Sequence, residues 1–185
     1  MKLFLETSLE DLYLALIDKN NKIVKSIHIP SLVKKTDALF CEINNLFDNT
    51  NYSIHNIKAI YVTLGPGSFS GARIGLLFAR TIAQVTNVKM FVTYTYELFK
   101  KQLQLSKKWE NLVLIKANKH SQYKIDFHQD EITTTLIENN NNYHAFDYKQ
   151  FEAKTVLYLA TFKEVKNPME IELAYLHNPQ IGGLK

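Results

Sequence analysis

The sequence predicts a mixed α/β fold in which an antiparallel sheet continues into parallel strands. Three apolar segments near the N-terminus are separated only by short polar links, which is typical of antiparallel hairpins. After them, strand-like segments alternate with segments of helical periodicity, and this alternation indicates parallel strands joined by helical crossovers. The chain has 185 residues, which is long enough to form a hydrophobic core.

The first half of the chain is predicted as three strands, helix, strand, helix, strand, helix. Pro30 ends the third strand and opens a helix that runs to Phe47, in which Leu39 belongs to an apolar set at helical spacing. The residue types of each segment decide its class, with β-branched and aromatic residues favouring strands. The expected strands are 2–7, 12–17, 22–29, 57–62 and 89–92, and the expected helices are 30–47, 72–85 and about 93–105.

The polar stretch at residues 106–108 predicts a boundary between two lobes. The larger lobe is residues 1–105 and the smaller is residues 106–185. The smaller lobe is too short to repeat the larger one in full. In it we expect strands at 111–117, 122–127, 131–137 and 155–160, a polar loop at 138–142 and a short helix from Pro168 to Leu176.

A glycine-rich turn lies between the strand at 57–62 and the following helix. Gly65 and Gly67 can adopt positive φ, and a serine can cap the helix through its hydroxyl. Free N–H groups at a helix start attract anions, so the turn is a candidate phosphate or nucleotide loop. The spacing does not match a P-loop, a dinucleotide fingerprint or a nucleophile elbow. A tight turn that seats the helix against the sheet is the alternative. The candidate residues are Gly65, Gly67, Ser68, Ser70 and Gly71.

The helix after this turn has an unusual surface. Its small residues Gly75, Ala79 and Ala83 recur every four positions, which lets another backbone approach closely. A surface helix normally has a wide polar face, but here the polar stripe is narrow and has a leucine in its middle. We therefore expect this helix to be internal or covered by a partner. The stripe consists of Arg73, Leu77, Arg80 and Gln84.

Composition places few limits on function. Hydrophobic residues make up 46% of the chain and charged residues 22%, which is ordinary for a globular protein. The net charge of +4 permits contact with RNA without requiring it. One cysteine, Cys41, excludes an internal disulfide framework. Because neither a signal peptide nor an apolar stretch of membrane length is evident, we expect a cytoplasmic protein without membrane contact.

Residues 65–75, read as Gly-Pro-Gly-Ser-Phe-Ser-Gly-Ala-Arg-Ile-Gly, resemble the G-P-G-S-F-T-G-L-R-I-G signature of the TsaB (YeaZ) family. Nine of eleven positions agree, and the departures are Ser70 and Ala72. The resemblance implies the actin-like ATPase (ASKHA, ribonuclease-H-like) superfold, with a complete N-terminal lobe and an abridged C-terminal lobe. The order of elements expected above agrees with that superfold.

The resemblance also implies a function. TsaB proteins are non-catalytic subunits of the complex that makes N6-threonylcarbamoyladenosine at adenosine 37 of tRNA. They pair with a catalytic TsaD-like subunit, work with a TsaE-like ATPase, form homodimers when alone, and contact tRNA through the complex. ATP or ADP at the interface with the partner is compatible with this role. The family's interface uses the first two helices, and the corresponding residues are Lys35, Leu39, Arg73, Leu77, Arg80 and Gln84.

The sequence contains few candidate catalytic residues. Glu6, in Glu6-Thr7-Ser8, occupies the place of the aspartate in the family's Asp-Thr-Ser motif. A carboxylate there can orient water or Mg²⁺, although a structural role is the alternative. The six histidines include no pair four residues apart, as a metal-binding helix would need.

We therefore expect no catalytic residue, no metal site and no enzymatic activity of the chain by itself. The alternatives are an active actin-like ATPase or kinase, and a peptidase. The first needs a second phosphate loop, and the second needs a metal pair or a nucleophile with its base. The sequence shows neither feature clearly.

Overall fold

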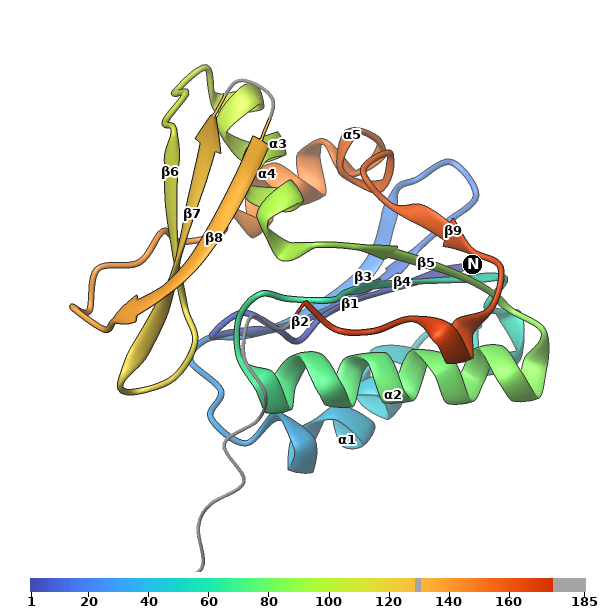
Figure 1. Cartoon of the computed structure of the whole chain (residues 1–185). Helices are drawn as coiled ribbons and strands as arrows, with labels where there is room; N and C mark the ends of the chain where they lie inside the picture. The colour runs from blue at the N-terminus through green and yellow to red at the C-terminus, as the bar shows by residue number, and fades with distance from the viewer. Residues whose placement is uncertain (129–130, 175–185) are drawn as a thin grey trace, which may run out of the picture.

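A six-stranded mixed sheet forms the centre of the molecule (Figure 1). The computed structural model describes residues 1–128 and 131–174. The strand order is β3-β2-β1-β4-β5-β9, in which β1, β4 and β5 are parallel while β2, β3 and β9 run antiparallel to their neighbours. The mixed α/β fold predicted from the sequence is thereby confirmed. The strands are β1 Lys2–Glu6, β2 Leu12–Ile17, β3 Ile23–Ile29, β4 Ala59–Thr63, β5 Lys89–Thr93 and β9 Lys163–Val165.

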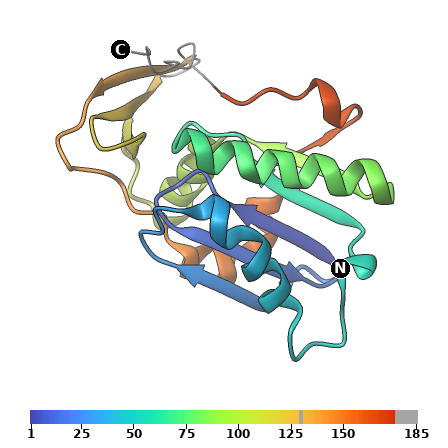
Figure 2. The same cartoon turned by 90° about the horizontal axis from the view of Figure 1, so that it is seen from below.

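Helices cover both faces of this sheet, as Figures 1 and 2 show. One face carries the two crossover helices, α1 (Lys35–Phe47) and α2 (Phe69–Thr86). The opposite face carries α3 (Thr95–Ser106), α4 (Tyr148–Ala153) and α5 (Thr155–Leu159). Two short 3-10 turns, Ile54–Asn56 and Pro168–Glu170, complete the helical elements of the described chain.

The central strand β1 contributes side chains to two separate hydrophobic cores. Its side chains alternate across the sheet, so Leu3 and Leu5 pack with the α1 and α2 side while Phe4 packs with the α3, α4 and α5 side. Residues Leu3 to Glu6 are fully buried because both faces are covered. This double burial explains why β1 and β2 read as continuous apolar runs rather than alternating ones.

A second sheet stands beside the first (Figure 1). It is an antiparallel meander of β6 (Leu112–Lys116), β7 (Ser121–His128) and β8 (Glu131–Glu138). Its apolar side chains, among them Val113 and Ile125, belong to the same core cluster as Phe4. The two sheets are therefore joined through one hydrophobic core.

The chain returns to the first sheet after this meander. Strand β9 pairs with β5, and α4 and α5 pack on the core that contains Phe4. The division into residues 1–105 and 106–185 stays a prediction, but residues 163–165 add a strand to the sheet of the larger part. None of the described helices combines the length and hydrophobicity needed to cross a membrane.

Two predicted elements were wrong. Residues 155–160, expected as a strand, form α5, and Thr155, Tyr158 and Leu159 are buried at helical spacing. A short apolar run does not distinguish a strand from a buried helix, which explains the error. The helix expected from Pro168 is only a 3-10 turn that ends at Glu170, and Leu176 lies outside the described residues.

Candidate functional site

The glycine-rich turn is held between the ends of β4 and β5. The backbone N–H of Leu64 donates to the carbonyl of Thr93 at 2.9 Å, and the N–H of Thr95 donates to the carbonyl of Gly65 at 2.8 Å. Gly65 has φ +83° and Gly67 has φ +159°, so the predicted positive φ values are confirmed. Ser68 caps α2, because its hydroxyl accepts from the N–H of Gly71 at 3.3 Å.

The start of α2 lies directly on the chain that follows β1. A Cβ atom on Gly67 would lie 2.2 Å from the carbonyl oxygen of Ser8, and one on Gly71 would lie 2.0 Å from that of Thr7. The N–H of Ser68 also donates to the Ser8 carbonyl at 2.6 Å. Any side chain would therefore collide with backbone. We call this packing of Gly67, Gly71 and Gly75 on Thr7 and Ser8 the glycine contact.

Glu6 lies under the glycine contact and is completely buried. Its Oε1 accepts hydrogen bonds from the Ser8 N–H at 2.7 Å, the Ser8 hydroxyl at 2.6 Å and the Leu9 N–H at 2.9 Å. Its Oε2 is buried without a hydrogen-bond partner among the described residues. Burial raises the pKa of the Glu6 carboxyl, and the hydrogen bonds from Ser8 and Leu9 oppose this rise.

Hydroxyl groups connect Glu6 to the other parallel strands. The Ser8 hydroxyl, which donates to Glu6, lies 2.7 Å from the Thr95 hydroxyl and 3.2 Å from the Thr63 hydroxyl. Thr63 ends β4 and Thr95 begins α3. The carboxyl ends of β1 and β4 and the start of α3 therefore meet in one buried polar network.

This arrangement does not fit a nucleotide-bound metal ion at Glu6. The fold class implies such an ion, but both oxygens of this carboxylate are buried within the chain. The N–H of Ser68 is already bonded to Ser8, while Ser70 remains exposed on the first turn of α2. No cluster of three metal-ligating side chains occurs in residues 1–128 and 131–174. Phosphate binding by the turn stays a prediction.

Two of the residues predicted for a partner interface do not lie on the surface. Lys35 is 5% exposed, and its Nζ donates to the carbonyls of Glu10 at 2.9 Å and Leu32 at 3.1 Å. Burial lowers the pKa of Lys35, although the nearby carboxylates of Glu6 and Asp11 oppose the change. Leu39 is fully buried in the core. The expectation that these two side chains form an interface is therefore corrected.

The outer side of α2 is exposed in part. Arg73, Leu77 and Gln84 are exposed, and Leu77 retains 56% of its surface. Arg80 is half-buried, because its Nε donates to the carbonyl of Pro168 at 2.9 Å. Phe40 of α1, which is 55% exposed, lies against the buried Phe78 of α2 with ring centroids 5.9 Å apart. The exposure of Phe40 was not predicted from the sequence.

The small-residue stripe of α2 faces the interior. Ala79 and Ala83 are buried in the core beneath the sheet, and a Cβ on Gly75 would lie 2.2 Å from the Thr7 hydroxyl oxygen. The stripe therefore lets α2 approach its own sheet. The close approach that these small residues predict is therefore made within the chain and not to a partner.

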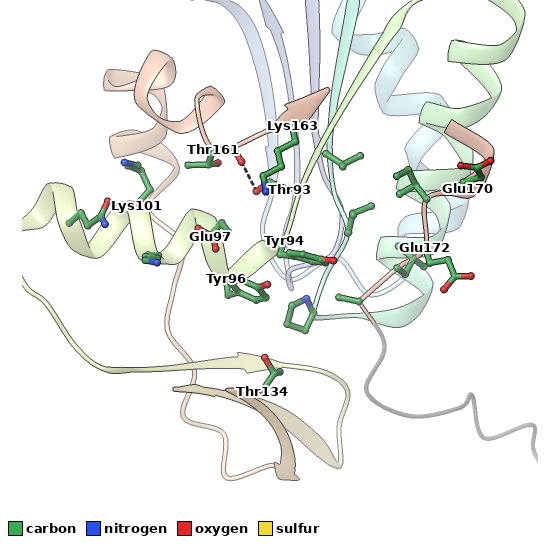
Figure 3. Close-up of a pocket in the computed structure, with 18 residues that line it drawn as sticks. Thr93, Tyr94, Tyr96, Glu97, Lys101, Thr134, Thr161, Lys163, Glu170 and Glu172 are labelled. Atoms are coloured by element: carbon green, nitrogen blue, oxygen red, sulfur yellow. Dashed lines mark hydrogen bonds between the residues drawn. The ribbon is translucent and has the colours of Figure 1, made fainter. Parts of the chain in front are cut away.

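A large cleft that sequence reasoning missed opens beside the turn (Figure 3). Its volume is about 1130 Å³, and it lies between α3, the ends of β4 and β5, β9 and the segment 170–174, with Thr134 of β8 opposite. Tyr94 and Tyr96 stack on one another at its edge, with ring centroids 5.2 Å apart. The only sequence signal was two tyrosines directly after a predicted strand.

The sheet order, the two crossover helices on one face and the glycine contact define a protein of mixed α/β architecture with a mixed sheet. The family model described as "TsaD: tRNA N6-adenosine threonylcarbamoyltransferase" matches residues 29–139. Because this match covers more than half of the chain, the chain belongs to the TsaD family.

Solved structures and relatives agree with this placement. The structure titled "YeaZ from Pseudomonas aeruginosa" matches with a TM-score of 0.57 and 18% identity, over 79% of this chain and 70% of that one. A second, a protein described as similar to peptidase YeaZ from Pseudomonas aeruginosa, gives a TM-score of 0.65 and 16% identity over 95% and 99%. The fold is thus that of YeaZ, as the signature at residues 65–75 predicted.

Two mycoplasma proteins match along nearly the whole chain. "Uncharacterized protein MG208 homolog" of Mycoplasma pneumoniae is 26% identical, covering 96% of this chain and 95% of its own length. "Uncharacterized protein MG208" of Mycoplasma genitalium is 21% identical over the same shares. The chain is therefore similar in extent to these relatives.

Replacing Gly71 with alanine should destabilise the protein, although the same change in an exposed helix interior stabilises by roughly 0.5–1 kcal/mol. The new Cβ would meet the Thr7 carbonyl, and overpacking of this kind costs about 1–3 kcal/mol. Gly75→Ala should also destabilise, through the Thr7 side chain. Urea unfolding of both variants measures the change in free energy.

Thr7→Ala distinguishes the clash of Gly75→Ala with the Thr7 side chain from the clash of Gly71→Ala with the Thr7 backbone. It removes a buried hydroxyl that has no partner among the described residues, so alone it should cost little. It should relieve most of the cost of Gly75→Ala, which meets the Thr7 side chain, and none of the cost of Gly71→Ala, which meets backbone. Equal rescue of both variants would contradict this account of the glycine contact.

Glu6→Gln should make stability less sensitive to pH. The folded-state pKa of Glu6 is raised, so above its ordinary pKa of 4.5 the unfolded chain loses its proton first and folding becomes less favourable as pH rises. The melting temperature of Glu6→Gln, minus that of the wild type, should therefore increase from pH 4.5 to pH 8. Glu138→Gln, at an exposed carboxylate on β8, is the matched control. A difference that decreases with pH would mean that the native state stabilises the Glu6 anion.

Proposed function

We propose that this chain is a non-catalytic subunit of a complex that forms N6-threonylcarbamoyladenosine in tRNA. The observation that carries the proposal is the burial of the Glu6 carboxylate. The carboxylate that an actin-like ATPase would direct at a metal ion is buried here and bonded to Ser8 and Leu9. Family membership and the YeaZ-like fold support the same role.

The partner surface in this proposal is the outer side of α1 and α2. Leu77 and Phe40 are large apolar side chains that remain more than half exposed on these helices. Arg73 and Gln84 flank Leu77 on α2 and are exposed too. An apolar centre with a polar rim is the usual anatomy of a protein interface. A TsaD-like subunit covers this side in the complex, and a second copy of the chain covers it when the partner is absent.

The remaining parts of the proposal follow from the resemblance. A TsaE-like ATPase joins the pair, ATP or ADP binds where the subunits meet, and tRNA is recognised by the whole complex. The meander β6 to β8 is the abridged remnant of a second lobe. The ATPase or kinase alternative is disfavoured by the burial of Glu6, and no observation on the described residues favours the peptidase alternative.

Leu77→Glu should leave the fold intact, because the side chain is 56% exposed, and should convert a dimer into a monomer. It should also abolish binding to the TsaD-like partner, since a charge would be buried in the interface. Light scattering measures the mass, and a pull-down with purified partner measures binding. Val156→Glu, at a residue 54% exposed on α5 across the sheet, is the control and should change neither property.

An unfolded Leu77→Glu variant would show that the residue is part of the core. A folded variant that still pairs with itself and with the partner would place the interface elsewhere. Phe40→Glu provides a second variant on the neighbouring helix, since Phe40 is 55% exposed.

The purified chain alone should neither hydrolyse ATP nor modify tRNA. Addition of the chain to a TsaD-like and a TsaE-like protein should restore threonylcarbamoylation of tRNA in a reaction that lacks only this subunit. Phosphate release and mass spectrometry of tRNA nucleosides measure the two activities. Steady ATP turnover by the chain alone, lost in Glu6→Ala, would overturn the proposal.

A further inference from the structure

The cleft beside the glycine-rich turn has the size of a ligand site. Its volume of about 1130 Å³ slightly exceeds the range that is usual for ligand pockets, roughly 300–1000 Å³. Its floor is formed by the carboxyl ends of two parallel strands, through Leu64 and Thr93. The segment 170–174 closes one end and is attached by the N–H of Ala174, which donates to the Leu64 carbonyl at 2.9 Å.

An aromatic platform lies in the cleft. Tyr94 and Tyr96 stack nearly parallel, with an interplanar angle of 19°, and Tyr94 retains 42% of its surface. Burial and the nearby Glu97 raise the pKa of Tyr96 to about 12, so this phenol is neutral at physiological pH. A stacked, partly exposed tyrosine beside a cavity is a surface on which a planar ring can stack.

Three basic side chains line the same cleft as the platform. Lys100, Lys101 and Lys163 line the cleft, and none of them forms an ion pair with a described residue. Figure 3 shows the side chain of Lys163 reaching from β9 toward Thr93. The cleft also has acidic residues, but the carboxylate of Glu172 points away from the Tyr94 ring and lies at the far end. Glu97 lies near Tyr96 but forms no ion pair with these lysines, so the cleft combines an aromatic face with three lysines that are not ion-paired to described residues.

We propose that this cleft binds an unpaired nucleotide of an RNA strand, with its base stacked on Tyr94 and its phosphate next to Lys163 and Lys100. Aromatic platforms beside positively charged grooves bind single-stranded nucleic acid, because every base has a π-face and every linkage has a phosphate. A free mononucleotide presents the same chemistry. The choice of an RNA strand rests on the proposed function, in which the substrate of the complex is a tRNA.

The experiment compares three ligands on the full-length chain by fluorescence anisotropy and calorimetry. They are an RNA hairpin with an unpaired loop, the same RNA annealed into a continuous duplex, and AMP. The hairpin should bind at least tenfold more tightly than the duplex. Tyr94→Ala should weaken hairpin binding on the order of tenfold, since one stacked base is lost. Lys163→Glu should weaken it as well and reduce its salt dependence, with a log-log slope smaller by about 0.7.

Two variants outside the cleft are the controls. Tyr52→Ala removes another tyrosine that is 39% exposed, and Lys58→Glu reverses another exposed lysine. Neither should change hairpin affinity by more than about twofold, because a screened surface charge far from a site has little effect. All four variants should melt at the wild-type temperature.

The outcomes decide the proposal. Equal affinity for hairpin and duplex, or unchanged affinity in Tyr94→Ala, would overturn it, and so would binding of AMP without binding of RNA. Tyr94→Ala should still bind the TsaD-like partner, whereas Leu77→Glu should still bind the hairpin as a monomer. Loss of one property without the other therefore distinguishes failure of the RNA site from failure of the proposed subunit role.

Discussion

The close approach of α2 to the chain after β1 is the contact on which the rest of this structure depends. Without side chains at Gly67 and Gly71, the helix start lies against the carbonyls of Ser8 and Thr7. Glu6 is buried directly before this contact, and the hydroxyl of Ser8 links it to the end of β4 and the start of α3. The close approach also fixes which side of α2 faces outward and leaves Leu77 exposed. The glycines in the signature at residues 65–75 are therefore required first of all for the close packing of α2 on the chain after β1.

The same contact explains how one fold can serve different chemistry. A carboxylate at the end of the first strand needs access to solvent and to a metal ion if it is to act on a nucleotide. In this chain the Glu6 carboxylate instead accepts three hydrogen bonds from the two residues that follow Thr7. A carboxylate that is buried and bonded in this way stabilises the turn at Ser8 and Leu9.

Sequence patterns within a few residues predicted those features of the structure that depend only on neighbouring residues. The strands β1 to β5, the α2 helix and the positive φ values of Gly65 and Gly67 follow from residue types within a few positions, whereas β9 was not predicted. The errors at residues 155–160 and after Pro168 are errors of local assignment, whereas the others concern contacts between distant segments. Lys35 is buried because Glu10 and Leu32 offer carbonyls to it, and the cleft exists because residues 170–174 return to Leu64. Neither pairing has a signal in one sequence, since each depends on the final position of another element.

The return of the chain to form β9 also affects how the protein is made. Residues 163–165 complete the sheet against β5, more than seventy positions earlier, and Phe162 joins Phe4 at a ring distance of 5.9 Å. During synthesis the outer edge of β5 therefore remains without its neighbour until residues 163–165 have left the ribosome. An unpaired strand edge is a template for association with other chains. Until residues 163–165 are available, this edge of the nascent sheet is thus open to mispairing.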